Sequence, residues 1–149
     1  MSPVIRWYDA NKVTPVFPFG HGLSYTSFAY EALSVRAVAH GADPKEIVAQ
    51  VELTVTNSGK RDGSEVVQLY LSFPSSAPAA HGEPPKQLKA FVKVPVSVGD
   101  TVKVGFPLIQ RDISTWDSEQ HAWAPVKGAF GVLIGASAAD IRLSATVEL

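Results

Sequence analysis

The amino-acid sequence predicts an all-β fold: an antiparallel sandwich of about seven strands, preceded by an extended N-terminal arm. Apolar and polar residues alternate with period two along most of the chain, which is typical of half-buried strands. Gly, Asn, Asp and Pro bound each alternating run, and no amphipathic helix of normal length separates the runs, so a parallel α/β sheet is disfavoured. The 149 residues, 46% of them hydrophobic, suffice for one such domain.

The arm is the least regular part of the chain. Residues 15–28 read PVFPFGHGLSYTSF, a run too apolar for a free tail and too interrupted by Pro and Gly for a helix or strand. The prolines stiffen its first half, and the glycines permit positive φ in its second half. We therefore expect a shaped connector that lies against another surface, and we divide the chain into an arm, 1–25, and a sandwich, 26–149.

The predicted strands of the sandwich follow the arm. The clearest is 47–57, where one face is apolar and the other is polar. Its apolar row is Ile47, Ala49, Val51, Leu53 and Val55. By the same alternation we expect strands at residues 28–38, 47–57, 65–73, 88–96, 102–108, 130–134 and 141–147.

Turn-forming residues mark the connections between these strands. One tight connection begins at Asn57 and Gly59 and ends at Asp62 and Gly63. The Asp62-Gly63 pair is typical of a hairpin turn. The longest connection is 73–86, rich in Pro and small residues. We expect it to be a solvated crossover between the two sheets, and a functional lip that reaches toward a ligand is the alternative.

The aromatic residues form two groups. Those of the arm are the candidate binding residues, because exposed apolar patches commonly mark protein interfaces. We interpret them as a strip that docks on another domain, and a stacking platform for polysaccharide or lignin is the alternative. The second group lies in or beside strands and is expected in the core, with Trp116 closing one end of the sandwich. The arm residues are Trp7, Tyr8, Phe17, Phe19 and Tyr25, and the core group is Phe106, Trp116, Trp123 and Phe130.

Composition and motifs argue against several other functions. The formal net charge of -1 and the pI near 6.4 give no basic surface for nucleic acid or anionic membrane. The four histidines are scattered and there is no cysteine, so no metal site is expected. No Gly-rich segment opens a helix, so no nucleotide cofactor is implied. The apolar runs are too short to span a bilayer.

Several motifs, in the same order along the chain, closely resemble the C-terminal domain of glycoside hydrolase family 3 β-glucosidases. The motifs are RWYDA at 6–10, PVFPFGHGLSYT at 15–26, VTNSGKRDGSEVVQLY at 55–70, PKQLKAF at 85–91, DISTWD at 112–117 and GAFGVLIGAS at 128–137. The resemblance implies an immunoglobulin or fibronectin type III-like sandwich. It also implies a secreted or periplasmic parent, of which this chain would be one part.

The resemblance implies a non-catalytic accessory role and no cofactor. In the family, the nucleophilic Asp and the acid/base Glu lie in other domains, and those catalytic domains would be this chain's partners. The parent enzyme would hydrolyse terminal β-D-glucosyl residues. A retaining glycosidase needs two carboxyl groups about 5 Å apart. Asp112, Asp117 and Glu119 are close in sequence, but we expect them to cap backbone amides at turns.

Overall fold

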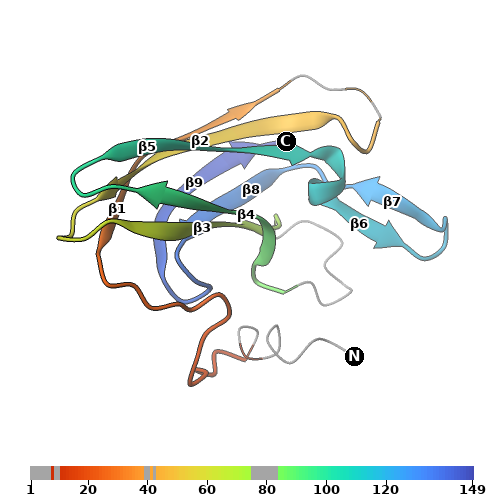
Figure 1. Ribbon diagram of the computed structural model, residues 1–149. Helices are drawn as coiled ribbons and strands as arrows, with labels where there is room; N and C mark the ends of the chain where they lie inside the picture. The colour runs from red at the N-terminus through yellow and green to blue at the C-terminus, as the bar shows by residue number, and fades with distance from the viewer. Residues whose placement is uncertain (1–7, 9–10, 39–40, 42, 75–83) are drawn as a thin grey trace.

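The structure, a computed structural model, describes residues 8, 11–38, 41, 43–74 and 84–149 (Figure 1). Within these residues the strands and a short 3₁₀ helix account for nearly all of the regular structure. Their bounds are β1 Phe28–Ala37, β2 Ile47–Asn57, β3 Gly63–Ser72, β4 Gln87–Val96, β5 Thr101–Ile109, η2 Gln110–Ile113, β6 Ser114–Asp117, β7 Ala122–Pro125, β8 Ala129–Gly135 and β9 Ile141–Glu148.

Seven of these strands form two antiparallel sheets packed face to face. The three-stranded sheet has the order β1-β2-β5, and the four-stranded sheet has the order β4-β3-β8-β9. Strand β1 lies beside β9, so one side of the sandwich is closed by neighbours from the two sheets (Figure 1). The predicted antiparallel sandwich is therefore confirmed, and each of its seven strands matches a predicted run to within about two residues.

The core lies between the two sheets and follows the period-two pattern. In β2, Val51, Leu53 and Val55 are fully or almost fully buried, as predicted. The start of this strand differs, because the pairing with β5 shifts between Ile47 and Ala49; Val48 is buried instead and Ile47 is exposed. The other sheet contributes Val67, Leu69, Leu71, Phe130, Val132 and Ile134, all with no exposed surface.

Two connections differ from the prediction. Strands β2 and β3 belong to different sheets, so residues 57–63 form an arch between sheets and the predicted hairpin turn at Asp62 is wrong. Asp62 instead accepts a hydrogen bond from the backbone N–H of Val98, 2.8 Å away. The long connection 73–86 joins β3 to β4, which pair within one sheet, so it is not a crossover between sheets. Its central residues, His81 among them, lie outside the described residues.

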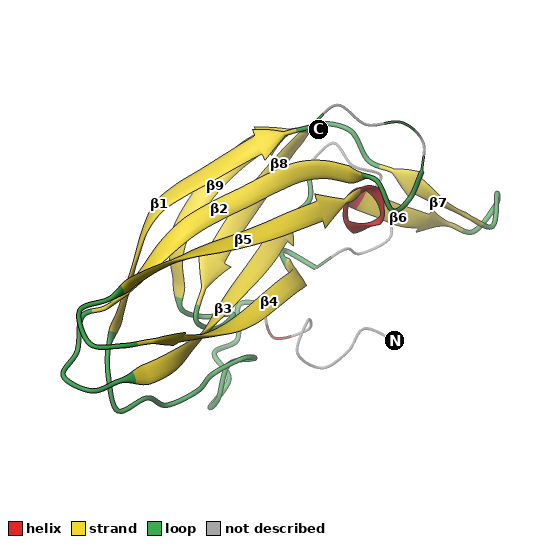
Figure 2. Cartoon of the chain, turned by 45° about the horizontal axis from the view of Figure 1, so that its top comes forward, coloured by secondary structure: helices red, strands yellow, loops and turns green. Residues whose placement is uncertain are grey.

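Strands β6 and β7 form a separate two-stranded hairpin that the alternation pattern did not reveal. The hairpin projects from one end of the sandwich (Figure 2). Trp116 and Trp123 pair across it with ring centroids 5.6 Å apart, and they remain 50% and 42% exposed. The Arg111 guanidinium lies 4.3 Å from the ring centroid of Trp123. The predicted core position of both tryptophans is wrong, whereas Phe106 and Phe130 are buried as predicted.

Candidate docking site

The arm returns to its own sandwich before β1 begins. Figure 1 shows it running past the end of the four-stranded sheet, on the side away from β2 and β5. A four-residue turn closes at His21, whose N–H donates to the carbonyl of Pro18 at 3.0 Å. Gly20 takes the third place of this turn with φ +78°, the φ that a type II turn requires. The turn directs the carbonyls of Phe19 and Gly20 toward the sandwich.

Two hydrogen bonds fix this turn to the four-stranded sheet. The N–H of Ala138 donates to the Phe19 carbonyl at 2.8 Å. The Gln68 side-chain amide donates to the Gly20 carbonyl at 3.1 Å and to the Ala136 carbonyl at 2.7 Å. The Gln68 amide oxygen also accepts a hydrogen bond from the Tyr70 hydroxyl at 2.6 Å. All of the hydrogen-bonding atoms of this amide group therefore have partners.

Gln68 and Tyr70 lie on the face of β3 opposite the core, yet both are buried. A buried amide without partners would destabilise the fold, so the bonds to Gly20 and Ala136 are what make this burial tolerable. The strand is consequently covered on both faces. Its sequence carries one signal of this, because Val66 and Tyr70 make the expected solvent face partly apolar.

Most of the arm's large side chains are exposed to solvent even though its backbone is anchored. Leu23 and Tyr25 are each 95% exposed and Phe17 is 76% exposed, while Phe19 is partly covered. Tyr8 is half-buried, and its carbonyl accepts from the N–H of Val13 at 2.9 Å. The remaining predicted docking residue, Trp7, lies outside the described residues. We call Val16, Phe17, Phe19, Leu23 and Tyr25 the docking strip.

A hollow of about 610 Å³ lies between part of the docking strip and the four-stranded sheet. Phe19 and Leu23 line one side, and Phe91 of β4 lines it from the sheet. Phe91 pairs across from Gln68, so both point to the outer face of the sheet, and Phe91 is 67% exposed. The aromatic surface therefore continues from the arm onto the sheet.

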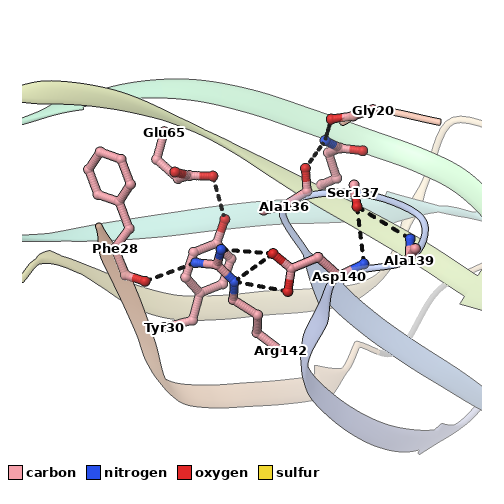
Figure 3. Close-up of polar contacts among 10 residues, drawn as sticks. Gly20, Phe28, Tyr30, Glu65, Ala136, Ser137, Ala139, Asp140 and Arg142 are labelled. Carbon is pink, nitrogen blue, oxygen red and sulfur yellow. Dashed lines mark hydrogen bonds and ion pairs between the residues drawn. The ribbon is translucent and has the colours of Figure 1, made fainter. Parts of the chain in front are cut away.

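Four polar residues at the end of this hollow connect the two sheets, and we call them the clasp: Tyr30, Glu65, Asp140 and Arg142. Arg142 of β9 donates to the Phe28 carbonyl of β1 at 2.8 Å and pairs with Asp140, also at 2.8 Å (Figure 3). The guanidinium lies 4.6 Å from the ring centroid of Tyr30, a cation–π contact. The Tyr30 hydroxyl donates to Glu65 of β3 at 3.0 Å.

The clasp shifts the pKa of three of its groups. Burial, reinforced by the neighbouring Glu65 carboxylate, raises the pKa of Tyr30 well above its usual value. The hydrogen bond from Arg142 lowers the pKa of Asp140, and the same contact raises the pKa of Arg142. Tyr30 is therefore held neutral while Asp140 and Arg142 are held charged, which is the pattern of a structural contact between sheets.

Two of the three carboxylates considered from sequence have structural partners. Asp112 accepts from the N–H of Ile109 at 2.9 Å, and Asp117 accepts from the N–H groups of Glu119 and Gln120 at 2.8 and 3.0 Å. Two of the predicted turn caps are therefore present. Among the described residues, no group of three or more histidine or acidic side chains could hold a metal ion, and no helix is long and apolar enough to cross a membrane.

Comparison with known proteins identifies the fold family. The family model described as "Fibronectin type III-like domain" matches residues 65–138, from β3 to the turn before β9. This chain carries a fibronectin type III-like (Fn3-like) domain. The sequence prediction of that domain is confirmed.

The relatives of this Fn3-like domain are β-glucosidases. Probable β-glucosidase L of Aspergillus fumigatus is 43% identical over 149 residues, which cover 92% of this chain and 20% of the relative. Probable β-glucosidase D of Aspergillus niger is 40% identical, with 95% of this chain and 20% of the relative covered. The crystal structure of β-D-glucoside glucohydrolase from Trichoderma reesei superposes with a TM-score of 0.89 at 40% identity, covering 96% of this chain and 21% of that structure.

The Fn3-like domain thus spans about a fifth of the length of these relatives. It corresponds to the Fn3-like region of family 3 β-glucosidases, as the motifs predicted. Sequence reasoning did not find Gln68 or Arg142, because each lies in a strand and its role depends on a contact with a distant segment. It also missed Tyr70, which bonds to Gln68 two residues away in the same strand.

Proposed function

We propose that this Fn3-like domain is a non-catalytic accessory domain of a family 3 β-glucosidase that buttresses the catalytic domains. In this proposal residues 1–25 are the arm and 26–149 the sandwich, and the docking strip is the surface that the catalytic domains cover. Hydrolysis of terminal β-D-glucosyl residues would belong to the parent enzyme. The partners would be its catalytic domains.

One observation carries this proposal: the arm has an anchored backbone and exposed side chains. Burying a large apolar side chain contributes about 1.5–3 kcal/mol, and Leu23 and Tyr25 gain almost none of it within this chain. A strip that is held in shape while its apolar groups face solvent is suited to bury them against a second surface. The relatives are about five times longer than this chain, which provides such a surface in proteins of this kind.

The test is a titration of the chain against the separately produced upstream domains of its β-glucosidase, followed by calorimetry. A triple variant, Phe17→Ser, Leu23→Ser and Tyr25→Ser, removes three exposed side chains of the docking strip and leaves the turn at Gly20 intact. We expect association to weaken at least tenfold, while the melting temperature of the chain barely changes. Val98→Ser, another exposed apolar position, is the matched control. Equal association of the triple variant and the unchanged chain would refute docking through this strip.

The alternative proposal, weak binding to insoluble cellulose, xylan or lignin, uses the same aromatic side chains. The same variants therefore separate the two roles in a pull-down on each polymer. Retention of the unchanged chain that is lost in the triple variant, together with unaltered association with the upstream domains, would favour the binding module. We also expect no turnover of aryl β-glucosides by this chain alone, and activity lost on Asp117→Asn would refute the accessory role.

A further inference from the structure

The contact between Gln68 and the Phe19–Gly20 turn requires a glycine at position 20, whereas position 22 has no such requirement. A Cβ added at Gly20 would collide with the Gln68 side chain, whereas a Cβ at Gly22 meets nothing within 4 Å. Gly20 also has a φ of +78°, a backbone angle that residues other than Gly rarely adopt. The glycine at position 20 therefore permits both the turn and the close approach of Gln68.

Gln68 is a polar side chain at a buried position in the middle of the sheet, where packing alone would favour an apolar residue. It lies in the middle of β3, pairs with Phe91 of β4 on one side and Gly135 of β8 on the other, and is only 4% exposed. Its amide bonds to two segments that are distant in sequence, the arm and the β8–β9 turn, and to Tyr70 of the same strand. The Ala138 N–H, from the same β8–β9 turn, bonds to the arm as well.

We infer that Gln68 is a positioning residue that latches the arm, at Phe19 and Gly20, to the outer face of the four-stranded sheet. The latch holds the docking strip in one orientation, so the arm acts as a rigid connector between domains and not as a flexible tether. Because the strip is ordered before it meets its partner, less conformational entropy is lost on docking. The role in docking rests on the function proposed above, but the latch itself is a property of this chain.

The latch can be tested in the chain alone with Gln68→Leu and Gly20→Ala, which act from opposite sides of the contact. Gly22→Ala and Ser64→Ala are the controls, because Gly22 has open space around it and Ser64 is an exposed residue of the same strand. The first readout is amide hydrogen exchange at Ala138. The second is chymotrypsin cleavage within the arm, where Phe19, Leu23 and Tyr25 are cleavage sites.

We expect both latch variants to accelerate Ala138 exchange and arm cleavage by about tenfold or more, since the arm opens when its anchoring bonds are lost. Exchange in the core of β8 should stay unchanged, and both controls should behave as the unchanged chain does. If Gln68→Leu fails to fold, Gly20→Ala decides the result. Exchange and cleavage at the unchanged rate in Gly20→Ala would overturn the latch.

Association with the upstream domains then tests the positioning role. Both latch variants should bind about tenfold more weakly, although the docking strip itself is intact. Faster arm cleavage with unchanged association would overturn the positioning role, because the orientation of the strip would not matter for docking. Failure of the unchanged chain to associate would refute the docking proposal and not the latch, which exchange and cleavage decide by themselves.

Discussion

Replacing Asn57 by Ala should destabilise this domain more than any other single polar substitution in the arch between β2 and β3. Asn57 is 1% exposed at the end of β2. Its side-chain N–H groups donate to the carbonyls of Arg61 at 2.8 Å and Val96 at 2.9 Å. Its oxygen accepts from the Thr26 hydroxyl at 2.7 Å and the Gly59 N–H at 3.1 Å. One side chain thus joins the residue that follows the arm, the arch and β4.

The magnitude follows from the groups left without partners. An unsatisfied buried donor or acceptor costs about 1–3 kcal/mol, and Asn57→Ala removes one buried bond, to the Val96 carbonyl, and three partly buried bonds. We therefore expect a loss of about 3 kcal/mol in the free energy of unfolding. With a urea m-value of about 2 kcal/mol/M, the unfolding midpoint should fall by about 1.5 M.

The assay is urea denaturation followed by tryptophan fluorescence and by circular dichroism. Ser58→Ala is the matched control, because Ser58 is the neighbouring exposed residue and makes one long bond of 3.3 Å to the Ser27 carbonyl. Its midpoint should move by less than about 0.3 M. A fall of the Asn57→Ala midpoint no larger than that of the control would refute the reasoning, since the four bonds would then contribute nothing net.

Three further predictions concern the core and the clasp. Phe130→Ala should cost about 3–5 kcal/mol in urea unfolding, whereas Trp116→Ala on the exposed hairpin should cost about 1 kcal/mol; a reversed order would contradict the observed burial. Because the pKa of Tyr30 is raised by folding, its contribution to stability is present below about pH 10 and is lost as the pH rises further, so stability should fall less steeply above pH 10 in Tyr30→Phe. Because the pKa of Asp140 is lowered by folding, its contribution to stability is present above about pH 4 and is lost as the pH falls. The small difference in melting temperature between the unchanged chain and Asp140→Asn should therefore vanish in acid. A difference that persists at about pH 2 would contradict the ion-pair explanation.

Much of the fold was available in the sequence because its signals are local. Alternation with period two located the seven sandwich strands, since the side chains of a strand alternate between core and solvent whatever it pairs with. The arm was recognisable because Pro and Gly exclude regular structure and its apolar residues need cover. The motifs from residue 6 to residue 137 pointed to the family, which the comparisons then supported.

The sequence could not determine which surfaces become covered, because that depends on segments distant along the chain. Trp116 and Trp123 look like core residues in a linear pattern, but their hairpin projects from the sandwich, and no second sheet formed by the described residues packs on it (Figure 2). Gln68 looks like a solvent-facing residue, yet it is buried because the arm, 48 residues earlier, supplies a carbonyl partner. Burial and hydrogen bonding at these positions are tertiary properties, and only the packing of the folded chain decides them.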